Sequence, residues 1–139
     1  TLDRSSAASD VYKRQAHLSA RGDIPREYTL VPAPTRPRSA RARGGDPVSA
    51  VCHAAAQHQR VGVCAALTMG QSTADQSELN AQDRWANLQG RVRVRAPIAQ
   101  GPALLADDVI TTGATLAASI AALQAAGVEV CGALVFADA

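Results

Sequence analysis

Aromatic side chains are scarce in this chain, where they account for 3% of the 139 residues. So few rings give little support for a platform on which the bases of single-stranded nucleic acid could stack. Long apolar runs are missing too, since none approaches the roughly 20 residues that a helix needs to span a bilayer. The N-terminus lacks the basic-then-apolar pattern of a signal peptide. We therefore expect no membrane span and a cytoplasmic protein.

Paired cysteines are also absent, because Cys52, Cys64 and Cys131 are far apart and form no CxxC motif. Such isolated cysteines are expected to be small buried side chains in a reducing cytosol. His53 and His58 are five positions apart on an expected helix, so they do not share a face. This spacing argues against a metal site between the two histidines.

Charge of either sign is low overall, and the net charge of +2 does not by itself indicate a nucleic-acid partner. The positive charge is concentrated, however, because four arginines fall within eight residues: Arg36, Arg38, Arg41 and Arg43. Prolines and a glycine pair in the same stretch predict a loop. The loop is either a binding site for an anion or a solvated run of charge with no ligand.

The first residues differ in composition from the rest, and the chain does not begin with methionine. The stretch "SSAASDVYKRQ" (5–15) resembles a translated sequencing-adapter or cloning scar. We therefore set residues 1–15 apart as non-native or disordered, and expect one domain over 16–139. We also expect the chain to be a fragment that lacks its true N-terminal part.

Apolar segments of strand length alternate with helical patterns along the domain. The expected strands are 28–34, 61–67, 91–95, 102–108 and 128–137. The expected helices are 47–60, with Pro47 as its first residue after Asp46, then 77–90, and 114–127, closed by Gly127. Leu116, Ile120 and Leu123 share one face of the last helix. The segments 35–46 and 68–79 are expected loops. Continuous apolar strands between helices predict an α/β fold with a doubly wound, mostly parallel sheet.

Two adjacent acids, Asp107 and Asp108, end the apolar strand in the stretch "ALLADDVITTGATLAAS" (103–119). Ligands bind at the carboxyl ends of strands in open α/β sheets. Neighbouring strand residues point to opposite faces, so only one acid faces a given side unless the chain is already turning.

The loop that follows these acids enters a helix, whose N-terminal N–H groups suit an anion. Thr111, Thr112 and Thr115 add hydroxyl donors, and Gly113 allows a close approach of the backbone to a phosphate. The acids can accept hydrogen bonds from two vicinal sugar hydroxyls, so the whole stretch predicts a site for a ribose 5-phosphate. The alternative is that Asp108 and the threonines only cap the helix. The stretch has neither the GxxxxGK nor the GxGxxG pattern.

The segment "LLADDVITTGAT" resembles the motif that binds 5-phosphoribosyl 1-pyrophosphate (PRPP) in type I phosphoribosyltransferases. This resemblance implies that Asp107 and Asp108 hold the ribose hydroxyls. It also implies a phosphate site built by Thr111, Thr112, Gly113, Ala114 and Thr115. It implies Mg²⁺ as well, held largely by PRPP oxygens and water, with the two aspartates as candidate direct ligands.

A narrower resemblance covers most of residues 28–139. The segment "LVPAPTRPRSARARGG" is similar to the "VPVP…R…RGFNQ" segment of the ComF family, bacterial phosphoribosyltransferase-like proteins associated with competence. The "Q…L…R…N" pattern of that family is matched by Gln76, Leu79, Arg84 and Asn87. The chain departs from the family at Gly45 and Asp46, where Phe and Asn are common, and lacks its cysteine-rich N-terminal segment.

By this resemblance Arg36 and Arg38 bind pyrophosphate, for which the planar guanidinium is well suited. Arg84 falls in the segment that forms the active-site loop of relatives and would stabilise the departing pyrophosphate. Its alternative is a surface arginine on a helix. Trp85 is expected to pack in the core or the loop.

Two functions of different class follow. The first is an enzyme that transfers the phosphoribosyl group of PRPP to a nitrogen acceptor. The second is a non-catalytic accessory protein in DNA uptake, which uses the fold to bind a ligand, DNA or the competence machinery. The sequence identifies neither the acceptor nor the oligomeric state.

Overall fold

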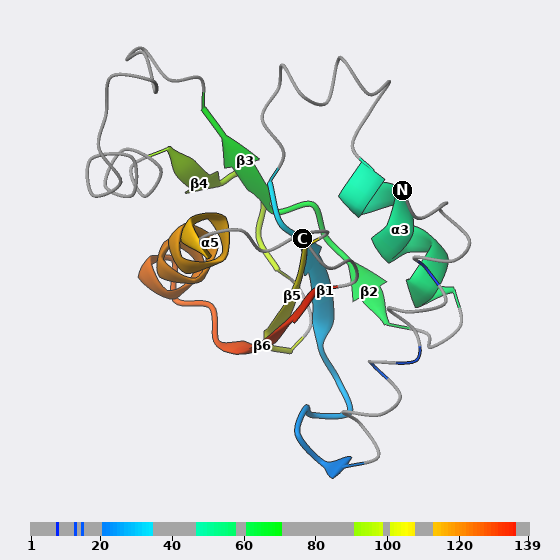
Figure 1. The fold of residues 1–139 in the computed structure, drawn as a ribbon. Helices are drawn as coiled ribbons and strands as arrows, with labels where there is room; N and C mark the ends of the chain where they lie inside the picture. Colours follow the sequence, from blue (N-terminus) through cyan, green and yellow to red (C-terminus); the bar gives the residue numbers. More distant parts are fainter. Residues whose placement is uncertain are drawn as a thin grey trace.

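The computed structural model describes residues 8, 13, 15, 21–34, 47–57, 61–70, 91–98, 101–107 and 113–135. Within them the strands are β1 Thr29–Pro32, β2 Gly62–Val63, β3 Leu67–Met69, β4 Val92–Val94, β5 Ala103–Asp107 and β6 Val130–Val135. The helices are α3 Pro47–Ala56 and α5 Ala114–Ala125. A four-stranded parallel sheet has the order β2-β1-β5-β6, and β3 and β4 form a separate antiparallel pair (Figure 1). The predicted α/β class with a mostly parallel sheet is confirmed.

The two central strands, β1 and β5, are buried along their whole length. Leu30 lies opposite Leu104 and Val31 opposite Leu105, and all four side chains are 0% exposed. Strands that are covered on both faces need apolar residues at every position, which explains the continuous apolar runs in the sequence. The strands predicted over 28–34 and 102–108 are confirmed.

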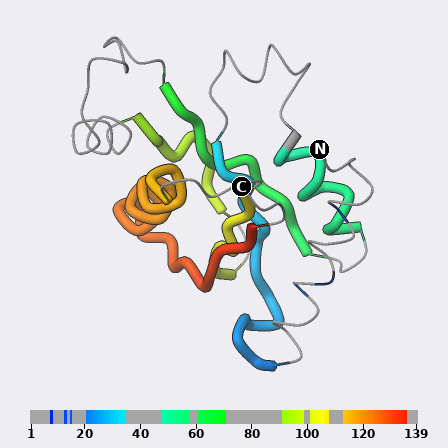
Figure 2. The backbone as a smooth tube through the Cα atoms, viewed as in Figure 1, coloured from blue at the N-terminus to red at the C-terminus, as the bar shows by residue number. Residues whose placement is uncertain are grey.

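Of the described helices, α3 covers one face of the sheet and α5 the other, as Figure 2 shows with the two helices on opposite sides of the strands. Leu30 and Leu104 pack with Val51 of α3 in one apolar cluster. Val31 and Leu105, which neighbour them in the strands, pack with α5 in the other cluster. Because successive strand residues point to opposite faces, two separate apolar layers form.

The predicted start of α3 and end of α5 agree with the structure, but the helix predicted over 47–60 ends earlier, at Ala56, and Gln57 is already in a turn. Helix α3 begins at Pro47, whose fixed φ and missing N–H suit the first helical position. After α5, the N–H of Gly127 bonds to the carbonyl of Gln124 at 3.0 Å and that of Val128 to Leu123 at 2.9 Å. This pair of bonds is a Schellman closure, which confirms the predicted end at Gly127.

The strand predicted over 61–67 is wrong as a single element. Val63 pairs with β1 in the main sheet, but β3 begins at Leu67 and pairs antiparallel with β4. The chain leaves the sheet after the bond from Cys64 N to Leu30 O, and Ala66 O accepts from Arg95 N. One apolar run therefore serves two sheets, and β3 extends into the segment that was predicted to be a loop.

The alternating segment 91–95 does contain a strand. In β4, Val92 is buried and Arg93 is exposed, so the strand has one buried and one exposed face. Most of the loops at 35–46 and 68–79 and the helix over 77–90 lie outside the described residues.

Three residues of the segment set apart at 1–15 are described. Ala8 is buried in the cluster with α3, and Nε2 of the fully buried Gln15 donates to the Tyr28 hydroxyl at 2.9 Å. These residues therefore contact the domain. In the described part of the chain, no helix has the length and apolar character needed to cross a membrane.

We predict that Gly101→Ala destabilises the fold far more than Gly113→Ala. Both glycines have positive φ, 61° and 76°, so alanine costs roughly 1–2 kcal/mol of backbone strain at each site. At Gly101 the added Cβ would also lie 2.5 Å from the carbonyl oxygen of Glu27, whereas at Gly113 no described atom lies within 4 Å. Urea unfolding of the two variants measures the difference, and equal losses would contradict the predicted clash.

Candidate functional site

The carboxyl ends of the two central strands lie side by side. Pro32 of β1 is in register with Ala106 of β5, and Ala33 N donates to Ala106 O at 2.8 Å. In the sequence, the basic segment 35–46 begins three residues after the end of β1, and the candidate acids directly follow Ala106. The edge where these strands end is the usual position of a ligand in an open α/β sheet.

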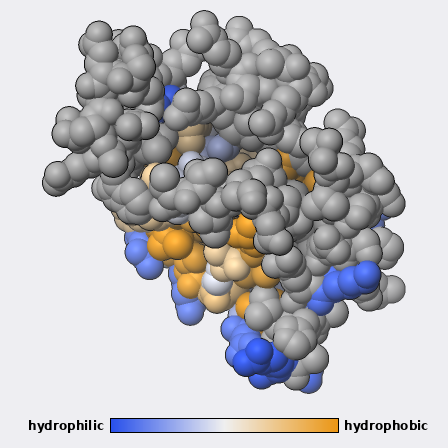
Figure 3. Space-filling view, in the orientation of Figure 1, coloured by the Kyte–Doolittle hydropathy of each residue, from blue (hydrophilic) through white to orange (hydrophobic). Residues whose placement is uncertain are grey.

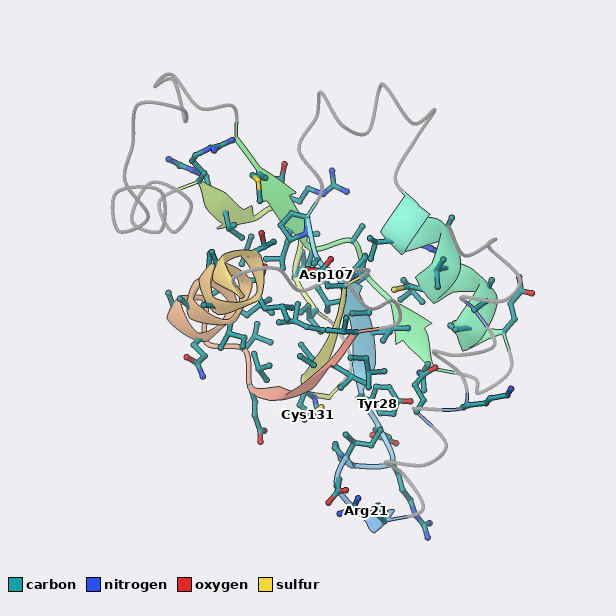
Figure 4. All side chains as sticks on the ribbon, viewed as in Figure 1. Arg21, Tyr28, Asp107 and Cys131 are labelled. Atoms are coloured by element: carbon teal, nitrogen blue, oxygen red, sulfur yellow. The ribbon has the colours of Figure 1, made fainter. Side chains whose placement is uncertain are left out.

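Asp107 is the last residue of β5 and is 9% exposed (Figure 4). It is in register with Val135 of β6. By strand alternation it points to the same face as Leu105, which is the face that α5 covers. Every other position of β5 is apolar, so this carboxylate interrupts the apolar pattern at the edge where ligands bind in open α/β sheets.

Helix α5 begins without the usual capping side chain. Gly113 stands at the N-cap with φ 76°, no side-chain hydrogen bond caps the helix there, and no acid lies in the first turn. The first helical bond runs from Ala117 N to Gly113 O at 2.9 Å. No acidic residue of the first turn offsets the partial positive charge of this N-terminus, which favours an anion nearby.

The first turn of α5 is fixed from its buried side. The hydroxyl of Ser119, which is 0% exposed, donates to the carbonyl of Thr115 at 2.7 Å. Thr115 is half-buried and Ala114 is buried. The turn that carries the candidate phosphate donors is therefore partly buried.

The structure places four of the predicted site residues: Asp107, Gly113, Ala114 and Thr115. Because the connection 108–112 is short, it brings the end of β5 and the start of α5 to the same edge. The remaining predicted site residues lie outside the described part of the chain: Asp108, Thr111, Thr112, Arg36, Arg38 and Arg84. The same holds for the residues that matched the second family pattern, Gln76, Leu79 and Asn87, and for Arg41, Arg43, Trp85 and His58.

Three arginines that the sequence analysis did not single out alternate along the β3–β4 ribbon. Nε of Arg91 donates to Gly70 O and Nε of Arg95 to Ala65 O, both at 2.8 Å. Arg93 lies between them and is exposed, while Val92 and Val94 pack against the α5 layer. The signal was the strict alternation of "RVRVR" itself, which puts all three cations on one face.

Two groups with shifted pKa values lie away from the candidate site. Figure 4 shows Tyr28 and Cys131 toward the opposite end of the sheet from Asp107. Burial raises the pKa of Tyr28, and the hydrogen bond from Gln15 opposes that shift. Burial likewise raises the pKa of Cys131, whose Sγ donates to Ala103 O at 3.3 Å.

The described cysteines are free thiols. Cys52 is 0% exposed in the core, as predicted, while Cys64 and Cys131 are half-buried. His53 is exposed, with Nδ1 2.9 Å from the carbonyl of Ser49. Among the described residues, no three potential metal ligands lie together.

A scan against protein-family models finds no match, and no curated protein matches the chain.

We predict that the free energy of unfolding falls as the solution becomes alkaline, because Cys131 and Tyr28 are held neutral in the folded state. A raised pKa contributes stability below the ordinary values of 9.0 and 10.0, and this stability is lost as pH rises through the folded-state pKa. Urea unfolding between about pH 8 and about pH 11 measures the effect. Tyr28→Phe should flatten the plot of unfolding free energy against pH at the high-pH end. An unchanged slope in that variant would rule out a contribution from Tyr28.

Proposed function

We propose that this chain binds PRPP, or a related ribose 5-phosphate compound, at the carboxyl edge of its sheet and transfers the phosphoribosyl group to a nitrogen acceptor. One observation carries the proposal. The buried Asp107 ends a central strand, and the short connection after it leads to a helix whose N-terminus has glycine at the cap and no acid in its first turn. An acceptor for sugar hydroxyls and a cradle for an anion therefore occupy one edge.

The motif "LLADDVITTGAT" supports the same assignment, because it resembles the PRPP motif of type I phosphoribosyltransferases. In this proposal Asp107 and Asp108 accept hydrogen bonds from the ribose 2- and 3-hydroxyls. The backbone N–H groups around Gly113 and the hydroxyl of Thr115 bind the 5-phosphate. Because residues 28–139 resemble the ComF family, we propose that the chain belongs to that family.

The reaction breaks the bond between C1 of the ribose and the pyrophosphate oxygen, and the bonding electron pair leaves with pyrophosphate. A nitrogen lone pair forms the new bond to C1, and the nitrogen releases its proton to solvent. Arg36, Arg38 and Arg84 are the proposed contacts of pyrophosphate, since each guanidinium can bind phosphate oxygens in pairs. The protein's contribution is positioning and stabilisation of charge.

The donor set at this edge fits Mg²⁺ because that ion is usually bound near phosphates by one or two carboxylates, water and substrate oxygens. Asp107 and Asp108 are the residues that would hold it. When bound, the ion neutralises charge on the leaving pyrophosphate.

A second function is the accessory role in DNA uptake, without turnover. The observation that favours it is the arginine face of β4, where Arg93 is exposed and neighbours Arg91 and Arg95 on the same side. Positive side chains on a two-stranded ribbon can contact a phosphate backbone without reading its sequence.

We predict that Asp107→Asn combined with Asp108→Asn weakens PRPP binding by about 100-fold or more, since hydrogen bonds to two charged acceptors are replaced. Isothermal titration calorimetry with PRPP and Mg²⁺ measures the change. Glu129→Gln, which removes one charge from an exposed residue at the start of β6, is the control and should bind as the parent does. Unchanged affinity in the double variant would contradict the ribose role.

Turnover is tested by pyrophosphate release across a panel of nucleobases, and release with any one of them supports the enzyme. If PRPP binds but pyrophosphate is not released with any acceptor, the result supports the accessory function instead. Gly113→Ala provides a second check on the phosphate site, because its added methyl group would stand where the backbone approaches the anion.

For the accessory function, we predict that Arg93→Ala lowers the salt dependence of DNA binding by about one unit of slope in log affinity against log salt concentration. Arg21→Ala is the matched control, because Arg21 is also exposed but lies at the far end of the molecule beside Asp23 (Figure 4). Fluorescence anisotropy with a single-stranded oligonucleotide at several salt concentrations measures both slopes. Equal slopes for the two variants would exclude a contact at β4.

A further inference from the structure

The outer edge of β6 differs from the other edge of the sheet. β6 has six residues, "VCGALV", with neither a charge nor a proline, and in the described part of the chain it pairs with β5 alone. At the other edge, β2 has only two residues, and α3 packs against it. Edge strands are normally shortened, charged or covered because their free N–H and C=O groups recruit other strands. In the described part of the chain β6 is not shortened, charged or covered. It does contain an extra residue at Cys131, where the pairing with β5 shifts from Val130–Ala103 to Gly132–Leu104.

The side chains around this edge are apolar and partly open to solvent. Ala133 is exposed, and Val130, Cys131 and Val135 are half-buried. Figure 3 shows hydrophobic surface gathered over the region of β6 and the adjoining part of α5. Val128, just before β6, and Ile120 of α5 are also apolar and half-buried, and they extend this surface. A contiguous apolar patch beside an unpaired strand marks a protein–protein contact.

We propose that this surface binds a second copy of the chain, with the two β6 strands antiparallel across a two-fold axis, so that two four-stranded sheets become one continuous sheet. A strand can always pair antiparallel with its own copy, since the contact is then isologous and each edge supplies the donors and acceptors that the other needs.

The composition of β6 favours this occupant over a foreign strand. Val130, Cys131 and Val135 would face small aliphatic or thiol side chains of the copy, and no pair of like charges would oppose each other within the strand. A charged partner segment would instead bring its charges against an edge that has no countercharge. Gly132 and Ala133 are small residues, which allows close approach of an identical strand.

This proposal is independent of the proposed PRPP site. The dimer would be symmetric about β6, whereas the candidate ligand site lies at the ends of β1 and β5 and the start of α5. A failure of PRPP binding would leave the dimer unaffected, and a monomeric protein would leave the PRPP proposal unaffected.

The test measures the mass of the protein in solution by sedimentation equilibrium over roughly 1 µM to 1 mM. We expect a concentration-dependent dimer. Ala133→Lys places a charge on the exposed edge and should weaken dimerisation by at least about tenfold. Ala121→Lys is the matched control, since it makes the same change at an exposed position in the middle of α5 and should dimerise as the parent does.

Hydrogen exchange locates the interface and remains informative if Ala133→Lys does not fold. The amides of 130–135 in the parent chain should exchange more slowly at high than at low protein concentration. A monomer over the whole concentration range would overturn the proposal. So would a dimer that persists in a folded Ala133→Lys variant, or exchange in β6 that does not depend on concentration.

Discussion

The parallel pairing of β1 with β5 is the constraint on which the rest of the structure depends. Leu30, Val31, Leu104 and Leu105 are 0% exposed, so the two strands are shielded from water on both faces. Their backbone groups can then be satisfied only within the sheet. This pairing also sets the register that places Ala33 beside Ala106, next to Asp107 at the end of β5. The site is a consequence of where two buried strands end.

Local signals made much of this fold predictable. Pro47 at a helix start, Gly127 at a helix end and the unbroken apolar run before Asp107 each act within a few residues of the chain, so the sequence alone identifies them. The alternation around Val92 was equally readable. These elements are the ones that position the described part of the candidate site, and for that reason the edge could be located before the structure was known.

The division of 61–67 between two sheets could not be predicted. An apolar run indicates burial but does not say which strand will pair with it. The bond from Cys64 N to Leu30 O holds the first part in the main sheet, while the pairing of Leu67 with Val94 holds the second part in the ribbon. Both partners are distant in sequence. Arg91, Arg93 and Arg95 were not singled out for the same reason. The sequence does not show that Val92 and Val94 pack against α5 while the arginines lie on the other face of β4.

The described part of the candidate site departs twice from what stability alone would select. Asp107 is a carboxylate at 9% exposure in a strand whose other positions are all apolar. A glycine at the N-cap of α5 leaves the helix without the side-chain hydrogen bond that Ser, Thr, Asp or Asn would supply. Either feature could be accidental by itself, but they lie on the two sides of one short connection. In the proposed function, a sugar phosphate would offer its hydroxyl groups to the carboxylate and its anionic group to the helix N-terminus. Neighbouring features that lower stability, such as this carboxylate and this glycine, are typical of binding sites.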